Sequence, residues 1–273
     1  MSKPLSTPVP LADAVAENRF GGKCVSLGSA IRASLPAPNG YALAVDLVTA
    51  IASGDAQAES SVLSLFSELA PAVAVRSSAV GEDSVDASFA GQHLTVLNVM
   101  DANAMVASIK QVHASAFTQE AIAYRARMGV DGEPAIAVVV QQQILSEVAG
   151  VMFTKNPITG VGERYIEASW GLGEAVVAGM VVPDSFRISA GGEVLEQSVG
   201  EKDIELVASA QGETEEREVE EGRITALCLS HSELEQLHSL ALKCEAVYGE
   251  QLDIEWAFHA GQLYLLQCRA ITN

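Results

Sequence analysis

Positive charge is scarce in this chain, which carries 16 Lys and Arg against 35 Asp and Glu and has a formal net charge of −19. Proteins that bind nucleic acid rely mainly on Lys and Arg to neutralise backbone phosphates, so this balance argues against a nucleic-acid partner. The acidic run from Gly212 to Gly222 is interpreted as a solvated loop or hairpin tip. Any polyphosphate site in such a chain has to draw on a few of its cations.

Long apolar runs and paired cysteines are absent as well. No window approaches the roughly 18 uninterrupted apolar residues of a membrane span, and the first residues lack the basic and apolar regions of a signal peptide. The four cysteines are scattered, with no C-x-x-C pair to suggest a metal site. These absences predict a cytoplasmic protein with no membrane partner. The hydrophobic content of 49% over 273 residues is enough for a full core.

The periodicity of apolar residues predicts a mixed chain. Helices are expected at residues 11–35 with a break at a glycine pair, 44–70, 102–128 and 230–249. In the last of these, Ser230 and Glu233 have the spacing of a capping box, and Gly249 supplies a stop. Strands are expected at 71–79, 88–99, 134–145, 149–154 and 163–169, with hairpins at 185–197 and 252–269. The second half is therefore the strand-rich one.

The hairpin LDIEWAFHAGQLYLLQCR, residues 252–269, carries polar side chains at every second position. Asp253 and Glu255 share one face of its first strand, and Gln267 and Arg269 share one face of its second. Paired carboxylates suit Mg²⁺, and a guanidinium can hold phosphate oxygens with two hydrogen bonds. A solvent-exposed hairpin face with an ordinary salt bridge explains the same pattern equally well.

Three further segments combine charge with small residues. Arg76 leads from an apolar strand into Ser77 and Ser78, whose N–H groups and hydroxyls could cradle oxyanions, although the segment is not a G-x-x-x-x-G-K-[ST] loop. Lys23 follows a glycine pair at the expected start of a helix, a place suited to anions. The third segment is a Gly-rich turn at 170–173, with a glutamate on each side. Each segment alone is also compatible with a plain strand or loop junction.

In order along the chain, these motifs resemble one family. GGKCVSLG, VAVRSSAVGEDSVDASFAGQHLTVLNV, AGVMFTKNPITG, EASWGLGEAVVAGMVVPDSF and LDIEWAFHAGQLYLLQCRA are similar to the N-terminal nucleotide-binding domain of phosphoenolpyruvate synthase and pyruvate phosphate dikinase, which rifamycin phosphotransferases share. The resemblance runs from about Gly21 to Arg269. It implies an α+β ATP-grasp fold in two lobes, approximately 1–130 and 131–273, with the nucleotide cleft between them.

The resemblance also implies roles for the matching residues. It implies ATP and Mg²⁺ as ligands, with Asp253 and Glu255 serving the metal. Catalytic roles fall to Arg76, Glu255 and Arg269. The implied nucleotide contacts are Lys23, Arg76, Ser77, Ser78, Gln141, Glu167, Gly171, Gly173, Glu174, Gln267 and Arg269. The polar face of the 252–269 hairpin is then expected to look into the cleft, with Ile254, Trp256 and Phe258 packed on the core.

In this family the phosphoryl acceptor is a histidine on a mobile domain, and ATP ends as AMP. Here neither a swivelling phosphohistidine domain nor a substrate barrel is expected, because the motifs end at Arg269 and none of the five histidines lies in a segment similar to the phosphohistidine motif. The favoured interpretation is a dikinase-type domain or subunit that phosphorylates a histidine on a separate domain or protein. Two alternatives stay open: an ATP-grasp kinase or ligase that acts directly on a small molecule, and a non-catalytic module that senses ATP.

Overall fold

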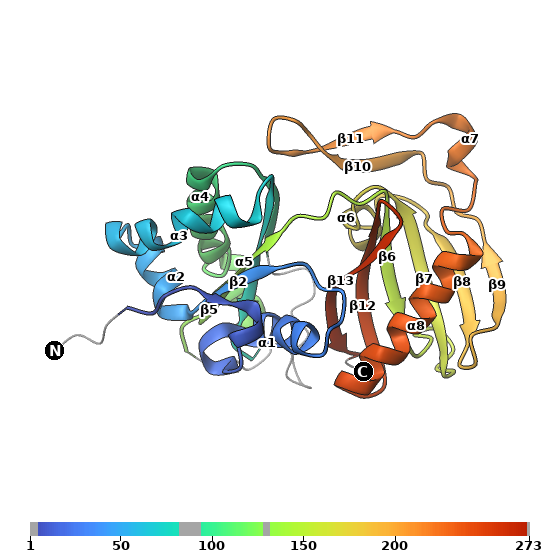
Figure 1. Cartoon of the computed structure of the whole chain (residues 1–273), viewed down its shortest axis with the longest axis horizontal. Helices are drawn as coiled ribbons and strands as arrows, with labels where there is room; N and C mark the ends of the chain where they lie inside the picture. The colour runs from blue at the N-terminus through green and yellow to red at the C-terminus, as the bar shows by residue number, and fades with distance from the viewer. Residues whose placement is uncertain (1–4, 82–93, 128–131, 272–273) are drawn as a thin grey trace.

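The computed structural model describes residues 5–81, 94–127 and 132–271. The chain forms two lobes, each built on its own antiparallel sheet. In Figure 1 the blue to light-green elements make up the first lobe, and the yellow to red elements make up the second. This confirms the α+β class and matches the two-lobed arrangement expected of an ATP-grasp fold. No helix among the described residues is long and apolar enough to cross a bilayer.

The sheet of the first lobe has the strand order β1-β2-β5-β3-β4. Its strands are β1 (Val9–Pro10), β2 (Gly40–Leu43), β3 (Val73–Ala79), β4 (Thr95–Val99) and β5 (Ile136–Gln142). Every residue of β3 is buried, because helices pack on both of its faces. One apolar cluster joins the sheet to the helices α2 (Val45–Ala52), α3 (Ala56–Leu69) and α4 (Ala102–Ser115), and another joins it to α1 (Glu17–Arg32).

Strand β5 corrects the expected boundary between the lobes. A division near residue 130 would place it in the second lobe, yet it pairs with β2 on one side and with β3 on the other. Its alanines and valines are buried in the first lobe's core, so the chain leaves that lobe only after Gln142. Residues 143–147 then lead to β6.

The second lobe is a six-stranded sheet with the order β13-β12-β6-β7-β8-β9. Its strands are β6 (Val148–Phe153), β7 (Glu163–Trp170), β8 (Asp184–Ser189), β9 (Val194–Ser198), β12 (Leu252–His259) and β13 (Gln262–Ala270). Helix α8 (His231–Tyr248) covers one face, where Ile254, Trp256 and Phe258 are buried as expected. The predicted capping box of Ser230 and Glu233 is present, and Gly249 ends the helix.

Two helical expectations need refinement. The helix expected over 102–128 is divided into α4 and α5 (Gln119–Arg127), and its last predicted residue lies outside the described ranges. Helix α1 contains a kink at Gly21, whose φ of 72° and ψ of 169° are non-helical. The glycine pair thus bends the helix, as the break in its apolar pattern indicated.

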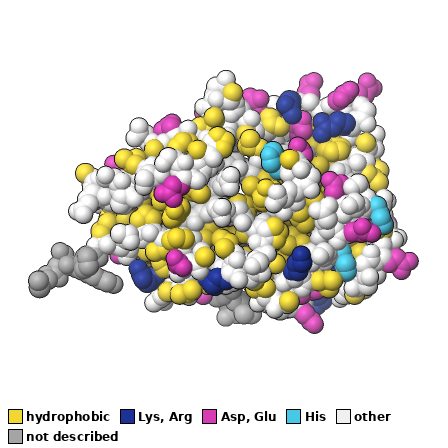
Figure 2. Space-filling view, in the orientation of Figure 1, with side chains coloured by type: hydrophobic (Ala, Val, Ile, Leu, Met, Phe, Trp, Pro, Cys, Tyr) yellow, Lys and Arg dark blue, Asp and Glu magenta, His cyan; other side chains and the backbone are white. Residues whose placement is uncertain are grey.

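Of the two interpretations of the acidic run, loop or hairpin tip, the structure shows a hairpin. Strands β10 (Ile204–Ala208) and β11 (Thr214–Glu218) pair with each other outside both main sheets. The short helix α7 (Glu221–Ile224) follows them. The acidic run from Gly212 to Gly222 therefore forms one strand of a hairpin and its surroundings, and all of β11 is exposed. Charged side chains gather over this hairpin at the upper right of Figure 2.

Candidate functional site

Strand register places the predicted acidic residues on one face of the second sheet, opposite α8. Glu255 lies beside Gln267 on β13 and beside Val151 on β6, which in turn lies beside Glu167 on β7. Directly paired residues project to the same side of a sheet. A parallel row joins Arg269, Asp253, Phe153 and Tyr165. The alternation seen in the sequence therefore gathers these polar side chains on one face of the sheet, the polar face, with Val151 and Phe153 of β6 between them.

Arg76 of the first lobe reaches this face. Its guanidinium donates to the Glu255 carboxylate at 2.9 Å, to the Gln267 side-chain oxygen at 3.1 Å and to the backbone carbonyl of Leu266 at 2.6 Å. The Leu266 carbonyl lies at a bulge, where the pairing of β12 and β13 shifts by one residue after Glu255. The Arg76 side chain is only 11% exposed, so its charge is held in a largely enclosed place between the lobes.

Lys23 joins the same group from helix α1. Its ammonium donates to the Gln267 oxygen at 2.5 Å, so that one amide oxygen accepts from Lys23 and from Arg76. The kink at Gly21 allows this approach, because the backbone of α1 lies against Ser78 of β3 there. Two cations that are far apart in the sequence thus meet at one residue of the C-terminal hairpin.

The second carboxylate of the hairpin, Asp253, pairs with Arg269 across the strands. Arg269 donates to Asp253 Oδ2 through Nε at 2.9 Å and through a terminal nitrogen at 2.8 Å. Burial raises the pKa of Asp253, and Glu255 adds to this, although Arg269 opposes it. The other oxygen, Oδ1, is buried and has no hydrogen-bond partner among the described residues. An unpartnered carboxylate oxygen beside a second acidic residue is compatible with a divalent cation.

The two glutamates that flank the Gly-rich turn have different surroundings. Glu167 lies in the polar face and accepts a hydrogen bond from the Tyr165 hydroxyl at 3.2 Å. Glu174 begins the short helix α6 (Glu174–Val177) and is accessible to solvent. Surrounding protein nevertheless raises its pKa by desolvation, and its carboxyl feels both Arg76 and Glu255. The Glu174 carboxyl therefore lies near enough to Arg76 and Glu255 for their charges to influence its pKa.

Three of the predicted nucleotide contacts are buried in the first lobe. Ser77 is 2% exposed, and its hydroxyl is buried without a partner among the described residues. The Ser78 hydroxyl is occupied by helix α1, since it donates to the carbonyl of Phe20 and accepts from the amide of Cys24. Gln141 is also 2% exposed and donates to the carbonyl of Pro38. The side chains of Ser78 and Gln141 thus bond within the first lobe, and the contacts of these three residues with nucleotide stay a prediction.

The glycines of the turn serve packing. A Cβ atom on Gly171 would stand 2.3 Å from the backbone oxygen of Leu206 in β10, and its φ is +76°. Both facts require glycine, and the close contact is with the β10–β11 hairpin. Gly173 precedes α6, and a Cβ there would stand 3.5 Å from the Ala149 side chain, an ordinary contact.

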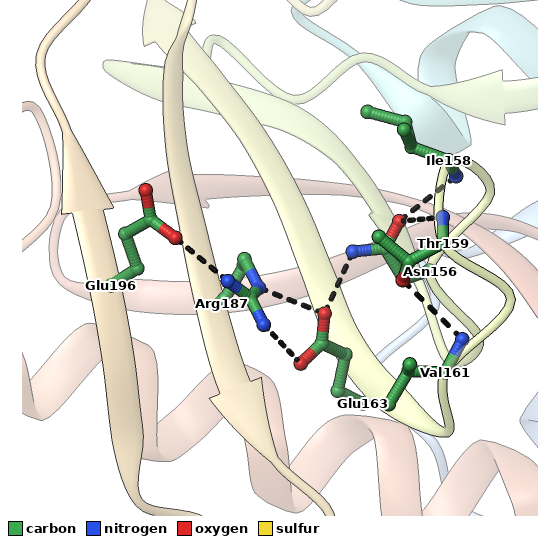
Figure 3. A network of polar contacts seen from close by, with 7 residues as sticks. All are labelled: Asn156, Ile158, Thr159, Val161, Glu163, Arg187 and Glu196. Atoms are coloured by element: carbon green, nitrogen blue, oxygen red, sulfur yellow. Dashed lines mark hydrogen bonds and ion pairs between the residues drawn. The ribbon is translucent and has the colours of Figure 1, made fainter.

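A second polar network occupies the far end of the same sheet (Figure 3). Arg187 donates to both oxygens of the buried Glu163, at 2.8 and 3.1 Å, and to Glu196 at 2.8 Å. Glu163 also accepts from Asn156 at 2.7 Å, and the hydrogen bond to Arg187 is the main reason that its pKa is lowered. Because two carboxylates offset the charge of Arg187, this network stabilises the 156–161 loop rather than offering a cation to phosphate.

Sequence comparison decides the family. Residues 55–273 match the model described as "Pyruvate phosphate dikinase, AMP/ATP-binding domain". The chain belongs to this family. The match includes most of the polar face described above, from Arg76 to Arg269, and confirms the resemblance seen in the motifs.

Curated members of the family are much longer than this chain. A probable phosphoenolpyruvate synthase of Methanocaldococcus jannaschii is 42% identical over 204 residues, which are 74% of this chain and 17% of that protein. The rifampicin phosphotransferase of Bacillus subtilis is 35% identical over 204 residues, 74% of this chain and 23% of that protein. The prodigiosin synthesizing transferase PigC of Serratia marcescens is 34% identical over an alignment 284 residues long, gaps included. That alignment covers 94% of this chain and 32% of that protein. The chain therefore spans less than a third of these relatives.

Solved structures resemble the chain only distantly. PH1788 from Pyrococcus horikoshii covers 96% of this chain with a TM-score of 0.43 and 13% sequence identity, and the match covers 96% of that protein. The D-alanine–D-alanine ligase of Bacillus anthracis, solved with ATP, covers 95% of this chain with a TM-score of 0.39 and 11% identity, and the match covers 57% of the ligase.

The number of acidic, His and Cys side chains near one another limits how this chain could hold a metal ion. Among the described residues there is no group of three or more His, Cys, Asp or Glu arranged to hold an ion. Mg²⁺ commonly takes only one or two protein carboxylates and completes its shell with water and phosphate oxygens. Asp253 and Glu255 fit that requirement.

Proposed function

We propose that the chain binds Mg·ATP on the polar face between the two lobes and passes a phosphoryl or pyrophosphoryl group to a histidine on a separate domain or protein, releasing AMP. The observation that carries this proposal is the meeting of Arg76, Lys23 and Gln267 with the Asp253–Glu255 pair. Phosphoryl transfer depends mainly on alignment and on neutralising charge, and these residues supply both.

The ion pairs of the site suggest how it accepts a charged ligand. Arg76 is paired with Glu255 and Arg269 with Asp253, so each cation already faces an anion. Asp253 and Glu255 would hold the metal of Mg·ATP, and the guanidiniums of Arg76 and Arg269 would hold its phosphates, so that each side chain keeps a partner of opposite charge. Such an exchange replaces each ion pair without leaving a buried charge unpaired. Bound Mg²⁺ would supply charge neutralisation at the phosphate oxygens.

Lys23 and Glu174 also have roles in the proposed ATP site. Lys23 adds a third positive charge from α1, and the bond from its ammonium to Gln267 fixes its place. Glu174 faces Arg76 from α6 and can orient that guanidinium toward phosphate. Glu167 extends the acidic row on β7. The proposed side-chain ligands and positioning groups are therefore Lys23, Arg76, Glu167, Glu174, Gln267 and Arg269.

The state of the cysteines supports a proposal about cellular location. All four cysteines, Cys24, Cys228, Cys244 and Cys268, are buried and unbridged. Reduced thiols are typical of the cytoplasm, where the ATP required by this reaction is available. We therefore propose a cytoplasmic protein.

The test resolves the nucleotide products. The chain is incubated with Mg·ATP, alone and with lysate of the source organism, and AMP, ADP, phosphate and pyrophosphate are separated. Asp253→Ala and Glu255→Ala should abolish turnover, whereas Glu235→Ala, on the exposed surface of α8, should not. AMP that depends on both carboxylates and rises with lysate supports the dikinase half-reaction. ADP would instead indicate direct transfer to a small molecule, and tight binding without turnover would indicate an ATP-sensing module.

A further inference from the structure

The β10–β11 hairpin extends from the second lobe toward the first, across the top of the view in Figure 1. At its base, Lys202 and Asp184 form an ion pair in which both side chains are fully buried, with 2.5 Å between Nζ and Oδ1. Asp184 also accepts from the amides of Gly200 and Cys228. The hairpin is therefore firmly attached to the second lobe at its root.

The tip of the hairpin is held by Asn98 of the first lobe. The Asn98 side-chain nitrogen donates to the carbonyl of Ser209 and to the carbonyl of Glu213, both at 2.8 Å. Asn98 is 2% exposed, so these two bonds are shielded from water. Both partners are carbonyl oxygens, and the single NH₂ group of Asn98 donates one hydrogen to each. The contact thus suits an amide side chain.

The backbone of the first lobe explains why this side chain points outward. Between Val73 and Val75 of β3, the pairing with β4 shifts, because β4 carries an extra residue at this place. Asn98 lies at the bulge with a φ of +54°. Asparagine tolerates this left-handed conformation better than most residues, and a bulge commonly redirects a side chain. The sequence thus places an asparagine where both the backbone and the hairpin require it.

From the tip, a short series of contacts leads to the candidate site. The carbonyl of Leu206 in β10 accepts from the amide of Leu172 at 2.8 Å, in the Gly-rich turn. Gly171 approaches the same carbonyl too closely for any side chain. Two residues after Leu172 comes Glu174 at the start of α6, near enough to Arg76 and Glu255 for their charges to act on its carboxyl. A displacement of the hairpin therefore moves the turn that carries Glu174.

We infer that Asn98 is a positioning residue: it holds the β10–β11 hairpin across the two lobes and thereby fixes the Gly171–Glu174 turn opposite Arg76. The inference rests on the proposed function in that the site it positions is the one assigned to ATP. Asn98 touches no ligand-binding side chain itself. It acts through the hairpin, so its loss should disturb the turn before it disturbs the fold.

Two variants test this inference. Asn98→Asp keeps the shape but replaces the donor with oxygen, and Asn98→Gly keeps the backbone conformation while removing the side chain. Asn103→Asp is the matched control, because the same charge change falls on an exposed position of α4. Amide hydrogen exchange by NMR is measured at Leu172, together with the Kd for Mg·ATP. We expect exchange at Leu172 to become at least about tenfold faster and the Kd to rise about tenfold in both variants. The control should change neither.

The readouts separate the possible failures. Unchanged exchange at Leu172 in both variants would overturn the inference, because the hairpin would then hold the turn without Asn98. Faster exchange with an unchanged Kd would also overturn it, since the turn would not influence the site. If the unmodified chain binds no Mg·ATP, the proposed function fails, whereas exchange at Leu172 still decides whether Asn98 holds the turn. Far-UV circular dichroism checks that each variant is folded.

Discussion

Gly21 lies where helix α1 meets strand β3, and its replacement by alanine should be costly for two separate reasons. Its φ of 72° and ψ of 169° fall in a region that is almost exclusive to glycine, which costs about 1–3 kcal/mol for other residues. An added Cβ would also stand 2.2 Å from the backbone oxygen of Ser78 and 2.5 Å from its carbonyl carbon. Overpacking of this kind costs about 1–3 kcal/mol.

Together these costs predict that Gly21→Ala lowers the free energy of unfolding by about 2–6 kcal/mol, a large part of the 5–15 kcal/mol that is usual for a folded protein. The obstacle is the backbone of a strand that is buried along its whole length, so helix α1 has to move away. Lys23 is two residues further on and would move with it. The affinity for Mg·ATP should therefore fall even in the fraction that stays folded.

The assay is urea unfolding followed by far-UV circular dichroism. Tryptophan fluorescence is recorded beside it, but Trp170 and Trp256 both belong to the second lobe and report mainly on that lobe. Gly160→Ala is the matched control, because its φ is also +72° while no other atom lies within 4 Å of the added Cβ. The control should lose only the conformational cost of about 1–2 kcal/mol. Equal losses in the two variants would refute the assignment of the larger cost to the contact with Ser78.

Three further outcomes are expected. Burial raises the pKa of Asp253, so its charged form opposes folding at neutral pH. Asp253→Asn should thus lower Mg-dependent turnover more than about 100-fold while leaving stability at pH 7 level or higher, and a marked loss of stability in urea would contradict this. The pKa of Glu163 is lowered below its ordinary value of 4.5, so its ionised form stabilises the fold above that pH and the benefit disappears as pH falls through the lowered pKa. Glu163→Gln should therefore be less stable than the unmodified chain at pH 7, and a difference that does not close in acid unfolding curves would count against the ion pair with Arg187. Ser230→Ala removes the capping box and should cost about 1 kcal/mol in thermal unfolding without changing the Kd for Mg·ATP, whereas a weakened Kd would show that α8 is coupled to the site.

The sequence by itself determined the features that depend on neighbouring residues. The alternation of Asp253 and Glu255 with Ile254 and Trp256 placed two sets of side chains on opposite faces of a hairpin, because successive residues of a strand point in opposite directions. Ser230 and Glu233 marked a helix start through a bond that spans three residues. Such patterns depend on short-range geometry, which is why they can be recognised along one chain.

Only the tertiary structure decided which lobe each element joined and which way some side chains turned. Strand β5 has a buried pattern that suits either sheet, and its pairing with β2 and β3 assigned it to the first lobe. Ser77 and Ser78 are alike in sequence, yet the Ser78 hydroxyl bonds to helix α1, whereas the Ser77 hydroxyl is buried without a hydrogen-bond partner among the described residues. Asn98 carried no local signal, because its partners are backbone carbonyls more than a hundred residues away. Contacts between backbone and distant side chains leave no periodic trace in a sequence, so they appear only when the chain is folded.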